Sequence, residues 1–319
     1  MLKHLTLGLL PVLMLAANAL AQVSPFKIDP NLKLSGRLAF VAEEDKQSRI
    51  YILDLDAKQV RPFVTTNLVA SYPSWSPDGT KLAFSSEVGG QREIYTANWD
   101  GSELARLTFS SKPADHPTWS PSGKSVLYYS GSNLFEASVD GGPPVKLTKF
   151  TGQNTTPAYA PDGTQISYST NRFWPGWDIC IFDLTNKKER CPMKAADSHC
   201  RAAWSPNGSS LAYSIGSGGE IDLELLKLAT GERTTLTRLP GREYDAGWSP
   251  SGGELALAAE EGRTDIFNIY LLTINTKQVK RIVESPLSLR YLSWTAATTL
   301  QLESKRLATQ QHEEDELKY

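Results

Sequence analysis

Residues able to bind a ligand gather in six short segments, each a few positions before an aromatic residue that recurs along the chain. The segments are 71–72, 115–116, 154–155, 199–201, 242–245 and 290–291. These segments combine hydroxyl, imidazole, guanidinium and carboxylate groups, so they offer hydrogen bonds and both signs of charge. Such a mixture suits a peptide or a glycan, and it equally describes the hydrated rim of an ordinary channel. The candidate binding residues are Tyr72, Asp115, His116, His199, Arg201, Arg242, Tyr244, Asp245 and Arg290.

A second candidate is the segment NRFWPGWD at 171–178, which holds three aromatic residues beside a proline and a glycine. Trp and Arg dominate binding hot spots, so Trp174 is predicted to contact a sugar or a partner protein. Phe173 and Trp177 are instead expected to pack against their own part of the fold.

The sequence contains no strong catalytic motif. The segment GWSPSG at 247–252 lacks the G-x-S-x-G spacing of a nucleophile elbow. His116 and His199 could hold a metal together with Asp115 or Asp197, but two histidines without H-x-x-x-H spacing are a weak signal. We therefore expect a binding protein that uses no cofactor. The alternative is a metal-assisted polysaccharide lyase or hydrolase.

Residues 1–21 have the features of a secretory signal peptide, with Lys3 near the start, an apolar run, and small residues up to Ala21. No later apolar stretch approaches the roughly 18–20 residues that cross a bilayer. The chain has 33 basic and 35 acidic residues without a basic cluster, which disfavours nucleic-acid binding. We expect a periplasmic or secreted monomer with no membrane span and no nucleic-acid partner.

The recurring aromatic residue reveals an internal repeat. It precedes turns such as WSPDG, and successive copies are separated by 44, 40, 45, 44 and 46 residues. A period of about 40–45 residues with four strand signals is typical of β-propeller blades. The six copies are Trp75, Trp119, Tyr159, Trp204, Trp248 and Trp294.

One repeat shows how the strands are expected to connect. Ser76 to Gly79 suit a type I turn, because Pro77 supplies the fixed φ and glycine ends the turn. Asp100-Gly101 is a two-residue hairpin signal. The aromatic residue is expected to lodge between adjacent blades. The predicted strands are 71–76, 81–87, 92–99 and 103–108.

Counting strands suggests how the ring closes. Residues 36–66 supply the last three strands of a blade, and 289–295 supply a first strand. Joining them gives an all-β, six-bladed β-propeller of four-stranded antiparallel blades, with seven blades as the second choice. The expected domains are a signal peptide (1–21), a lead segment (22–35), the propeller (36–304) and a disordered acidic tail (305–319).

The repeat resembles the TolB-type, or PD40, β-propeller family. The resemblance rests on P-x-WSPDG-x-K-L-A-F-x-S at 73–84, followed by I-Y and D-G at 94–101 and R-L-T at 106–108. It implies an envelope scaffold that mediates protein–protein interactions, whereas an oligogalacturonate-lyase-like relative would be an enzyme. TolB carries an α/β domain before its propeller, so this chain is expected to be a propeller-only relative.

The resemblance to a propeller also places the candidates. Connections from the outer strand to the next innermost strand share a face with the loops between the second and third strands. The repeated turns lie on the other face. We therefore expect function at the mouth formed by the varied segments.

Two of the three cysteines are predicted to form a disulfide. Cys180 and Cys191 lie on neighbouring strands, at the same offset as Tyr95 and Arg106 in the aligned repeat, so they should face each other. This would leave Cys200 unpaired. A Cys191–Cys200 bridge and three buried thiols are the alternatives.

Overall fold

A computed structural model of the chain describes residues 24–63, 68–88, 90–149, 151–173, 175–193, 198–217, 219–297 and 301. Every named element in these ranges is a β-strand. No helix within them is long and apolar enough to cross a membrane. The predicted signal peptide, Trp174, Asp197 and the predicted tail 305–319 lie outside the described residues.

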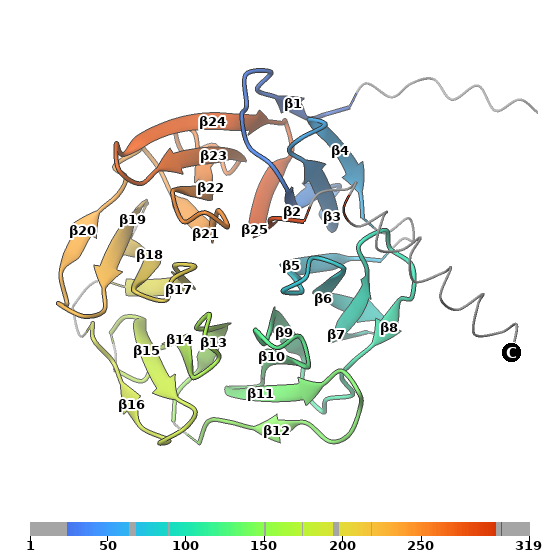
Figure 1. Cartoon of the computed structure of the whole chain (residues 1–319), viewed down its shortest axis with the longest axis vertical. Coiled ribbons are helices and arrows are strands. Elements are labelled where there is room, and N and C mark those ends of the chain that lie inside the picture. The colour runs from blue at the N-terminus through green and yellow to red at the C-terminus, as the bar shows by residue number, and fades with distance from the viewer. Residues whose placement is uncertain are drawn as a thin grey trace, which may run out of the picture.

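The strands form six antiparallel sheets arranged as a ring, which confirms the six-bladed propeller and removes the seven-bladed alternative (Figure 1). Blade 1 joins β25 (Ser288–Thr295), β2 (Arg37–Glu44), β3 (Gln47–Asp54) and β4 (Gln59–Pro62). Blade 2 contains β5 (Ala70–Trp75), β6 (Lys81–Val88), β7 (Gln91–Asn98) and β8 (Ala105–Arg106). Blade 3 contains β9 (Ala114–Trp119), β10 (Ser125–Ser130), β11 (Asn133–Ser138) and β12 (Val145–Lys146).

The other three blades follow the same order from the centre outward. Blade 4 contains β13 (Asn154–Tyr159), β14 (Gln165–Thr170), β15 (Asp178–Asp183) and β16 (Glu189–Arg190). Blade 5 contains β17 (Ser198–Trp204), β18 (Ser210–Ser217), β19 (Glu220–Lys227) and β20 (Arg233–Thr235). Blade 6 contains β21 (Glu243–Trp248), β22 (Glu254–Glu260), β23 (Phe267–Thr273) and β24 (Gln278–Glu284), with β1 (Lys27–Ile28) paired to β24 as a fifth strand.

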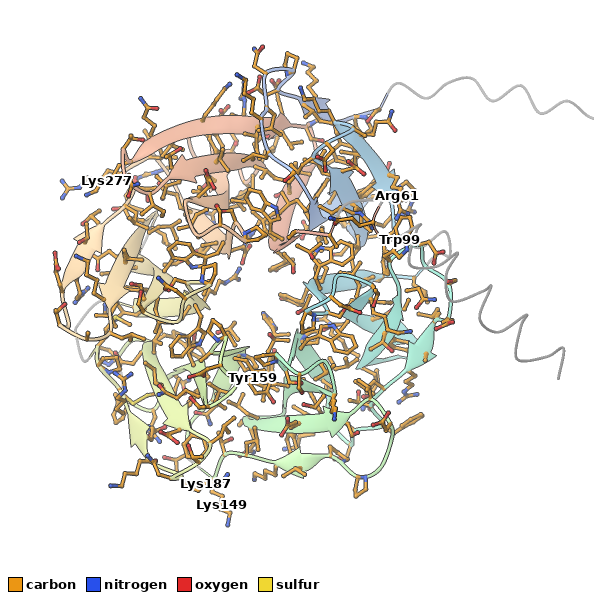
Figure 2. The ribbon with its side chains drawn as sticks, in the orientation of Figure 1. Arg61, Trp99, Lys149, Tyr159, Lys187 and Lys277 are labelled. Carbon is orange, nitrogen blue, oxygen red and sulfur yellow. A yellow bond between two sulfur atoms is a disulfide. The ribbon has the colours of Figure 1, made fainter. Side chains whose placement is uncertain are left out.

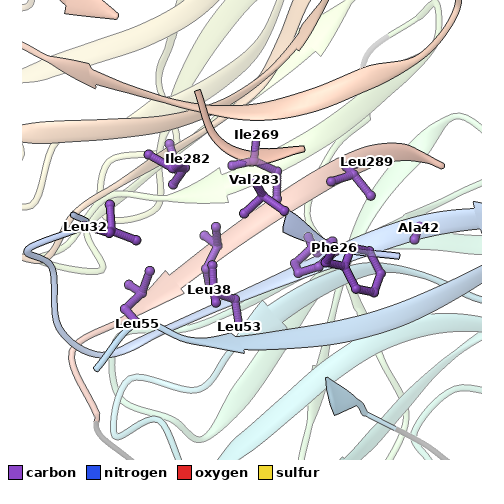
Figure 3. Close-up of a cluster of buried hydrophobic side chains, with 12 residues drawn as sticks. Phe26, Leu32, Leu38, Ala42, Leu53, Leu55, Ile269, Ile282, Val283 and Leu289 are labelled. Carbon is purple, nitrogen blue, oxygen red and sulfur yellow. The ribbon is translucent and has the colours of Figure 1, made fainter. Parts of the chain in front are cut away.

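The two ends of the chain close the ring together. The last strand, β25, pairs with β2 as predicted, and the lead segment crosses from β24 of blade 6 to blade 1. Phe26 and Leu32 of this segment are buried with Leu38 of blade 1 and with Ile269 and Val283 of blade 6 (Figure 3). Apolar burial therefore spans the junction where the covalent chain is open.

The connections within a blade differ from the predicted ones in one respect. The repeated turn is confirmed: Gly79 donates its N–H to the carbonyl of Ser76 (2.8 Å) with a φ of +69°. The Asp100-Gly101 hairpin is longer than the predicted two-residue loop. A two-residue type I′ turn needs positive φ at both central residues. Here Gly101 is left-handed (φ +87°), and its N–H donates to Asn98.

The outermost strand of blade 2 is also shorter than the predicted 103–108. The hydroxyl of Thr108 accepts the N–H of Ile94 (2.9 Å), in place of a further bond in the strand ladder. Thr148 does the same for Leu134. The threonine of R-L-T at 106–108, and that of the corresponding K-L-T at 146–148, thus ends the outer strand with its side chain.

The repeated aromatic residue lies between blades, as predicted. Trp119 is buried, and its indole N–H donates to the carbonyl of Ser74 in blade 2 (3.1 Å). Trp75 and Trp248 reach the preceding blade in the same way. Tyr159, near the centre of the ring in Figure 2, donates its hydroxyl instead to Glu136 of blade 3 (2.6 Å). The turn motif therefore joins neighbouring blades.

Candidate binding site at the channel mouth

Each innermost strand contains a β-bulge at the same position. In blade 2, for example, Ser71 pairs with Ser85 and Ser74 with Ala83, so one extra residue is inserted between them. The residue three positions before each repeated aromatic has a positive φ, between 46° and 59°. Left-handed φ values are uncommon for residues other than glycine and concentrate at functional sites. The six residues are Tyr72, His116, Thr156, Arg201, Asp245 and Tyr291.

We call these six residues the mouth ring. They line one cavity of about 150 Å³ at the centre of the propeller, where the innermost strands meet. The neighbouring positions that line the same cavity are apolar or small: Pro73, Pro117, Pro157, Ala202, Ala203, Ala246 and Leu292. The cavity therefore combines the six side chains of the mouth ring with an apolar lining, which we call the apolar neck.

One side of the mouth ring is aromatic. The ring centroids of Tyr72 and His116 are 3.5 Å apart, and those of Tyr72 and Tyr291 are 4.1 Å apart. The two tyrosine hydroxyls lie 3.3 Å from each other. Burial lowers the pKa of His116 to about 4, outweighing the favourable field of Asp115, so the imidazole is neutral at neutral pH.

The other side of the mouth ring is charged, and Arg290 lies beside it without lining the cavity. Asp245 accepts hydrogen bonds from Arg201, from Arg290 Nε (2.9 Å) and from the backbone N–H of Tyr291 (3.1 Å). Burial alone would raise the pKa of Asp245, but the two guanidinium groups lower it to about 2. Asp245 is therefore ionised, and it holds both arginines at the mouth.

Two further predicted residues support the mouth ring from beside it. Tyr244 lies against both arginines, with guanidinium carbons 4.8 Å (Arg201) and 4.7 Å (Arg290) from its ring centroid. Asp115 is buried and accepts a hydrogen bond from Arg92 (2.6 Å) next to His116. Both fix the orientation of ring residues without lining the cavity.

His199 and Arg242 are not brought into the site. His199 is fully buried; its Nε2 lies 3.2 Å from Arg233 and its imidazole 5.7 Å from the ring of Tyr213. Arg242 pairs with Glu260 (2.8 Å) and with Asp265. Neither residue lines the mouth cavity.

Thr156 and Tyr291 also belong to the mouth ring. Thr156 lies outside the six predicted segments, and Tyr291 lies within the last segment but is not among the candidate binding residues. Thr156 shares a hydrogen bond with Ser169 (2.7 Å), and Tyr291 packs on Tyr72. Both stand three positions before the repeated aromatic, as all six ring residues do. Aligning the six repeats on that aromatic would have found them.

Within the described ranges, one group of three side chains has the spacing of metal ligands: Cys180, Glu189 and Cys191. Its two sulfurs form the predicted disulfide, with Cα atoms 4.1 Å apart, and Cys200 is free. A disulfide-bonded sulfur is not a thiolate ligand, so this group does not fit a metal. His116 and His199 belong to no such group of the described residues.

A larger cavity of about 920 Å³ lies at the opposite mouth, among the repeated turns. It is lined by Trp75, Trp248 and Trp294 and by turn residues such as Pro77 and Pro250. These tryptophans are the residues that join neighbouring blades. The two mouths are therefore built from different parts of the repeat.

Comparison with known proteins agrees with this architecture. The family described as "TolB beta propeller domain" matches residues 15–172. The repeat, the ring of six blades and this match together decide the family. The chain belongs to the TolB-type β-propeller family. A curated relative, the Tol-Pal system protein TolB of Francisella tularensis subsp. mediasiatica, is 31% identical over 119 residues.

Structural likeness extends over more of the chain. The crystal structure of TolB from Acinetobacter baumannii has a TM-score of 0.69 at 20% identity, covering 84% of this chain and 68% of that one. An oligogalacturonate lyase in complex with manganese has a TM-score of 0.54 at 13% identity, covering 78% and 74%. TolB and an oligogalacturonate lyase thus share this fold, so the likeness describes the fold alone.

The match to the Francisella TolB covers 37% of this chain and 27% of that protein. The chain therefore matches about a quarter of the length of its curated relatives.

Proposed function

We propose that this TolB-type propeller is an exported scaffold of the bacterial envelope that binds a partner protein or peptide at the mouth ring. The observation that carries the proposal is the contrast within the repeat. Six residues share one uncommon backbone conformation and surround one cavity, yet their side chains differ from blade to blade. Side chains that serve the fold repeat, as the inter-blade tryptophans do, whereas these six vary.

The contacts within the mouth ring favour binding over catalysis. A general base must be free to accept a proton near neutral pH. The pKa of His116 is about 4, and its imidazole packs against Tyr72. The carboxylate of Asp245 is occupied by two arginines. Both candidate bases are thus committed to holding the ring together.

A closed propeller also suits a scaffold energetically. Its blades hold the mouth ring before the partner arrives, so little conformational freedom is lost on binding. The predicted signal peptide and the family membership support a periplasmic location and an envelope partner. We propose a monomeric propeller that needs no cofactor; a glycan is a less favoured ligand.

Site-specific crosslinking in the envelope tests this proposal. A photoreactive benzoylphenylalanine in place of Tyr72 should crosslink to a partner protein, whereas the same residue in place of Asp162, in an exposed turn at the other mouth, should not. Tyr72→Ala combined with Tyr291→Ala should abolish capture of that partner by residues 22–319 from envelope extract. Equal crosslinking at both positions, or unchanged capture by the double variant, would overturn the proposal.

A further inference from the structure

Arg201 of the mouth ring and the adjacent Arg290 provide two guanidinium groups for the one carboxylate of Asp245. Arg201 and Arg290 both pair with Asp245, and no other salt bridge of either arginine occurs among the described residues. The side chains of Arg201 and Arg290 are 24% and 15% exposed, so they are mostly buried but still reach solvent. One guanidinium charge at this mouth is therefore not balanced by a direct partner.

Both arginines also keep N–H groups available. A guanidinium has five N–H donors. In the described part of the chain, Arg201 uses its Nη1 and Arg290 its Nε toward Asp245, and their remaining N–H groups have no acceptor. None of these remaining donors is a buried, unpaired atom. The unused N–H groups of the two arginines can therefore donate hydrogen bonds to a second carboxylate, as the other N–H groups already do to Asp245.

The arrangement fixes the arginines before a ligand arrives. Tyr244 lies against both guanidinium groups, Phe267 lies 4.4 Å from that of Arg290, and Tyr291 lies 5.5 Å from that of Arg201. Aromatic packing restricts the flexible arginine side chains, so less entropy is lost when they bind an anion.

The cavity beside these arginines limits the size of the ligand. Its volume of about 150 Å³ corresponds to a few water molecules, and its neck is lined by Pro73, Pro117 and Ala202. A carboxylate on a short aliphatic stem matches a cavity in which charged groups adjoin the apolar neck. A uronic acid carries its carboxylate on a bulky, hydroxyl-rich ring, which this neck could not satisfy with hydrogen bonds.

We propose that the mouth ring binds a peptide carboxylate, which sits between Arg201 and Arg290 while its aliphatic stem enters the apolar neck. This proposal rests on the proposed binding function and names the chemistry of the partner segment, an acidic peptide. The carboxylate is that of an Asp or Glu side chain or of a chain terminus.

Short peptides test the proposal directly. The probes are a blocked Gly-Gly-Glu-Gly-Gly, its Gln counterpart, an unblocked Gly pentamer with a free C-terminal carboxylate, and a galacturonate trimer. The side-chain Nε–H resonances of Arg201 and Arg290, followed by NMR during titration, should shift with the Glu peptide and not with the Gln peptide. The Gly pentamer then shows whether a terminal carboxylate is accepted. Binding of the galacturonate trimer without the Glu peptide would overturn the assignment to a peptide.

Three variants locate the interaction. Arg290→Gln should weaken binding of the Glu peptide about tenfold or more, since a hydrogen bond to a charged group is lost. The matched control Arg281→Gln, whose guanidinium pairs with Glu284 of the outer strand β24 and with Glu261 just after β22, should leave binding unchanged. Asp245→Asn removes the competing carboxylate, so a correctly folded variant should bind the Glu peptide more tightly. A purely structural role for Asp245 predicts weaker binding.

These outcomes separate the two proposals. If Tyr72 crosslinks to a partner but Arg290→Gln and an excess of Glu peptide leave that crosslink unchanged, the carboxylate proposal is wrong and the binding function stands. If no partner reaches Tyr72, the binding function itself fails, whatever the peptides do.

Discussion

The propeller has two mouths: the mouth ring, and the opposite mouth formed by the repeated turns, which we call the turn mouth. Both need left-handed backbone conformations, but different residue types adopt them. At the turn mouth, each described turn of blades 2 to 6 has one left-handed residue, and it is always glycine: Gly79, Gly123, Gly163, Gly208 and Gly252. At the mouth ring, every blade again has one left-handed residue on its innermost strand, and none of the six is glycine. Glycine adopts this conformation without steric cost, whereas other residues lose roughly 1 kcal/mol or more.

The difference indicates what each mouth is for. At the turn mouth only the chain reversal matters, so glycine is the best residue in every blade. At the mouth ring the side chain is kept despite the conformational cost, and its chemistry changes from Tyr72 to His116 to Arg201. The repeated mouth therefore stabilises the ring, and the varied mouth presents groups to a ligand.

The largest predicted effect on stability comes from removing an inter-blade tryptophan. It tests whether the turn mouth stabilises the fold without taking part in binding. Trp119→Ala should lower the free energy of unfolding by about 3–5 kcal/mol, because a buried aromatic and its bond to Ser74 are lost. Urea denaturation measures the loss. The affinity of the variant for the Glu peptide, determined below the denaturation midpoint, should equal that of the wild type. A folded Trp119→Ala protein with impaired binding would show that the two mouths are not separate.

The disulfide lies on the outer edge of blade 4, away from both mouths, so its removal should change stability without involving either mouth. Cys180 and Cys191 close a short loop, and the disulfide lowers the entropy of the unfolded chain. Replacing both cysteines with serine removes this constraint and should lower the free energy of unfolding by about 3 kcal/mol. Thermal melts with and without a reducing agent measure this. The control Cys200→Ser should melt like the wild type in both buffers, and denatured, unreduced wild-type protein should expose one free thiol.

The sequence was sufficient for the parts of the molecule that repeat. The spacing of Trp75, Trp119 and their counterparts predicts the blades, the unpaired strands at both ends predict the closure, and register predicts the disulfide. Each follows from local rules applied several times. The bulges do not, because a strand with one extra residue still has ordinary strand composition.

Because the bulges were not predicted, the residues of the mouth ring were predicted only in part. Polar residues in six segments before the repeated aromatics were expected at the mouth, but the bulge directs one position per blade toward the centre. His199, two positions before Arg201, is instead fully buried beside Tyr213 and Arg233. Thr156 was passed over because its neighbours Asn154 and Thr155 have equally suitable side chains. Backbone conformation, not residue type, selects the residues of the ring.

Two buried groups on the side of the mouth ring have pKa values shifted in opposite directions, so the pH dependence of stability distinguishes their contributions. Burial raises the pKa of Glu243 to about 7, and burial lowers that of His116 to about 4. The folded state holds the Glu243 proton that the unfolded chain releases, so this contribution to stability falls as pH rises from about 4.5 to 7. The unfolded chain protonates His116 first, so that contribution falls as pH drops from about 6.5 to 4.

The two contributions largely cancel in the wild type, and single variants should reveal each one. His116→Gln should become less stable as pH rises from about 4.5 to 7, and Glu243→Gln should become more stable as pH rises from about 4 to 6.5, each by up to about 3 kcal/mol. Denaturation series at several pH values measure both slopes. Parallel pH profiles for the two variants would contradict the assignment of opposite signs.

The smallest predicted effect tests the conformational cost of the mouth ring itself. Thr156 is β-branched and left-handed (φ +46°), a combination that is strongly disfavoured. Asparagine tolerates this conformation and can still bond the hydroxyl of Ser169, so Thr156→Asn should raise stability by about 0.5–1 kcal/mol. The matched change at the turn mouth of the same blade, Gly163→Ala (φ +72°), should lower stability by about 1 kcal/mol. Calorimetric melts of both variants should therefore move in opposite directions, whereas a loss in both would mean that Thr156 carries no strain and that the two mouths do not differ as argued.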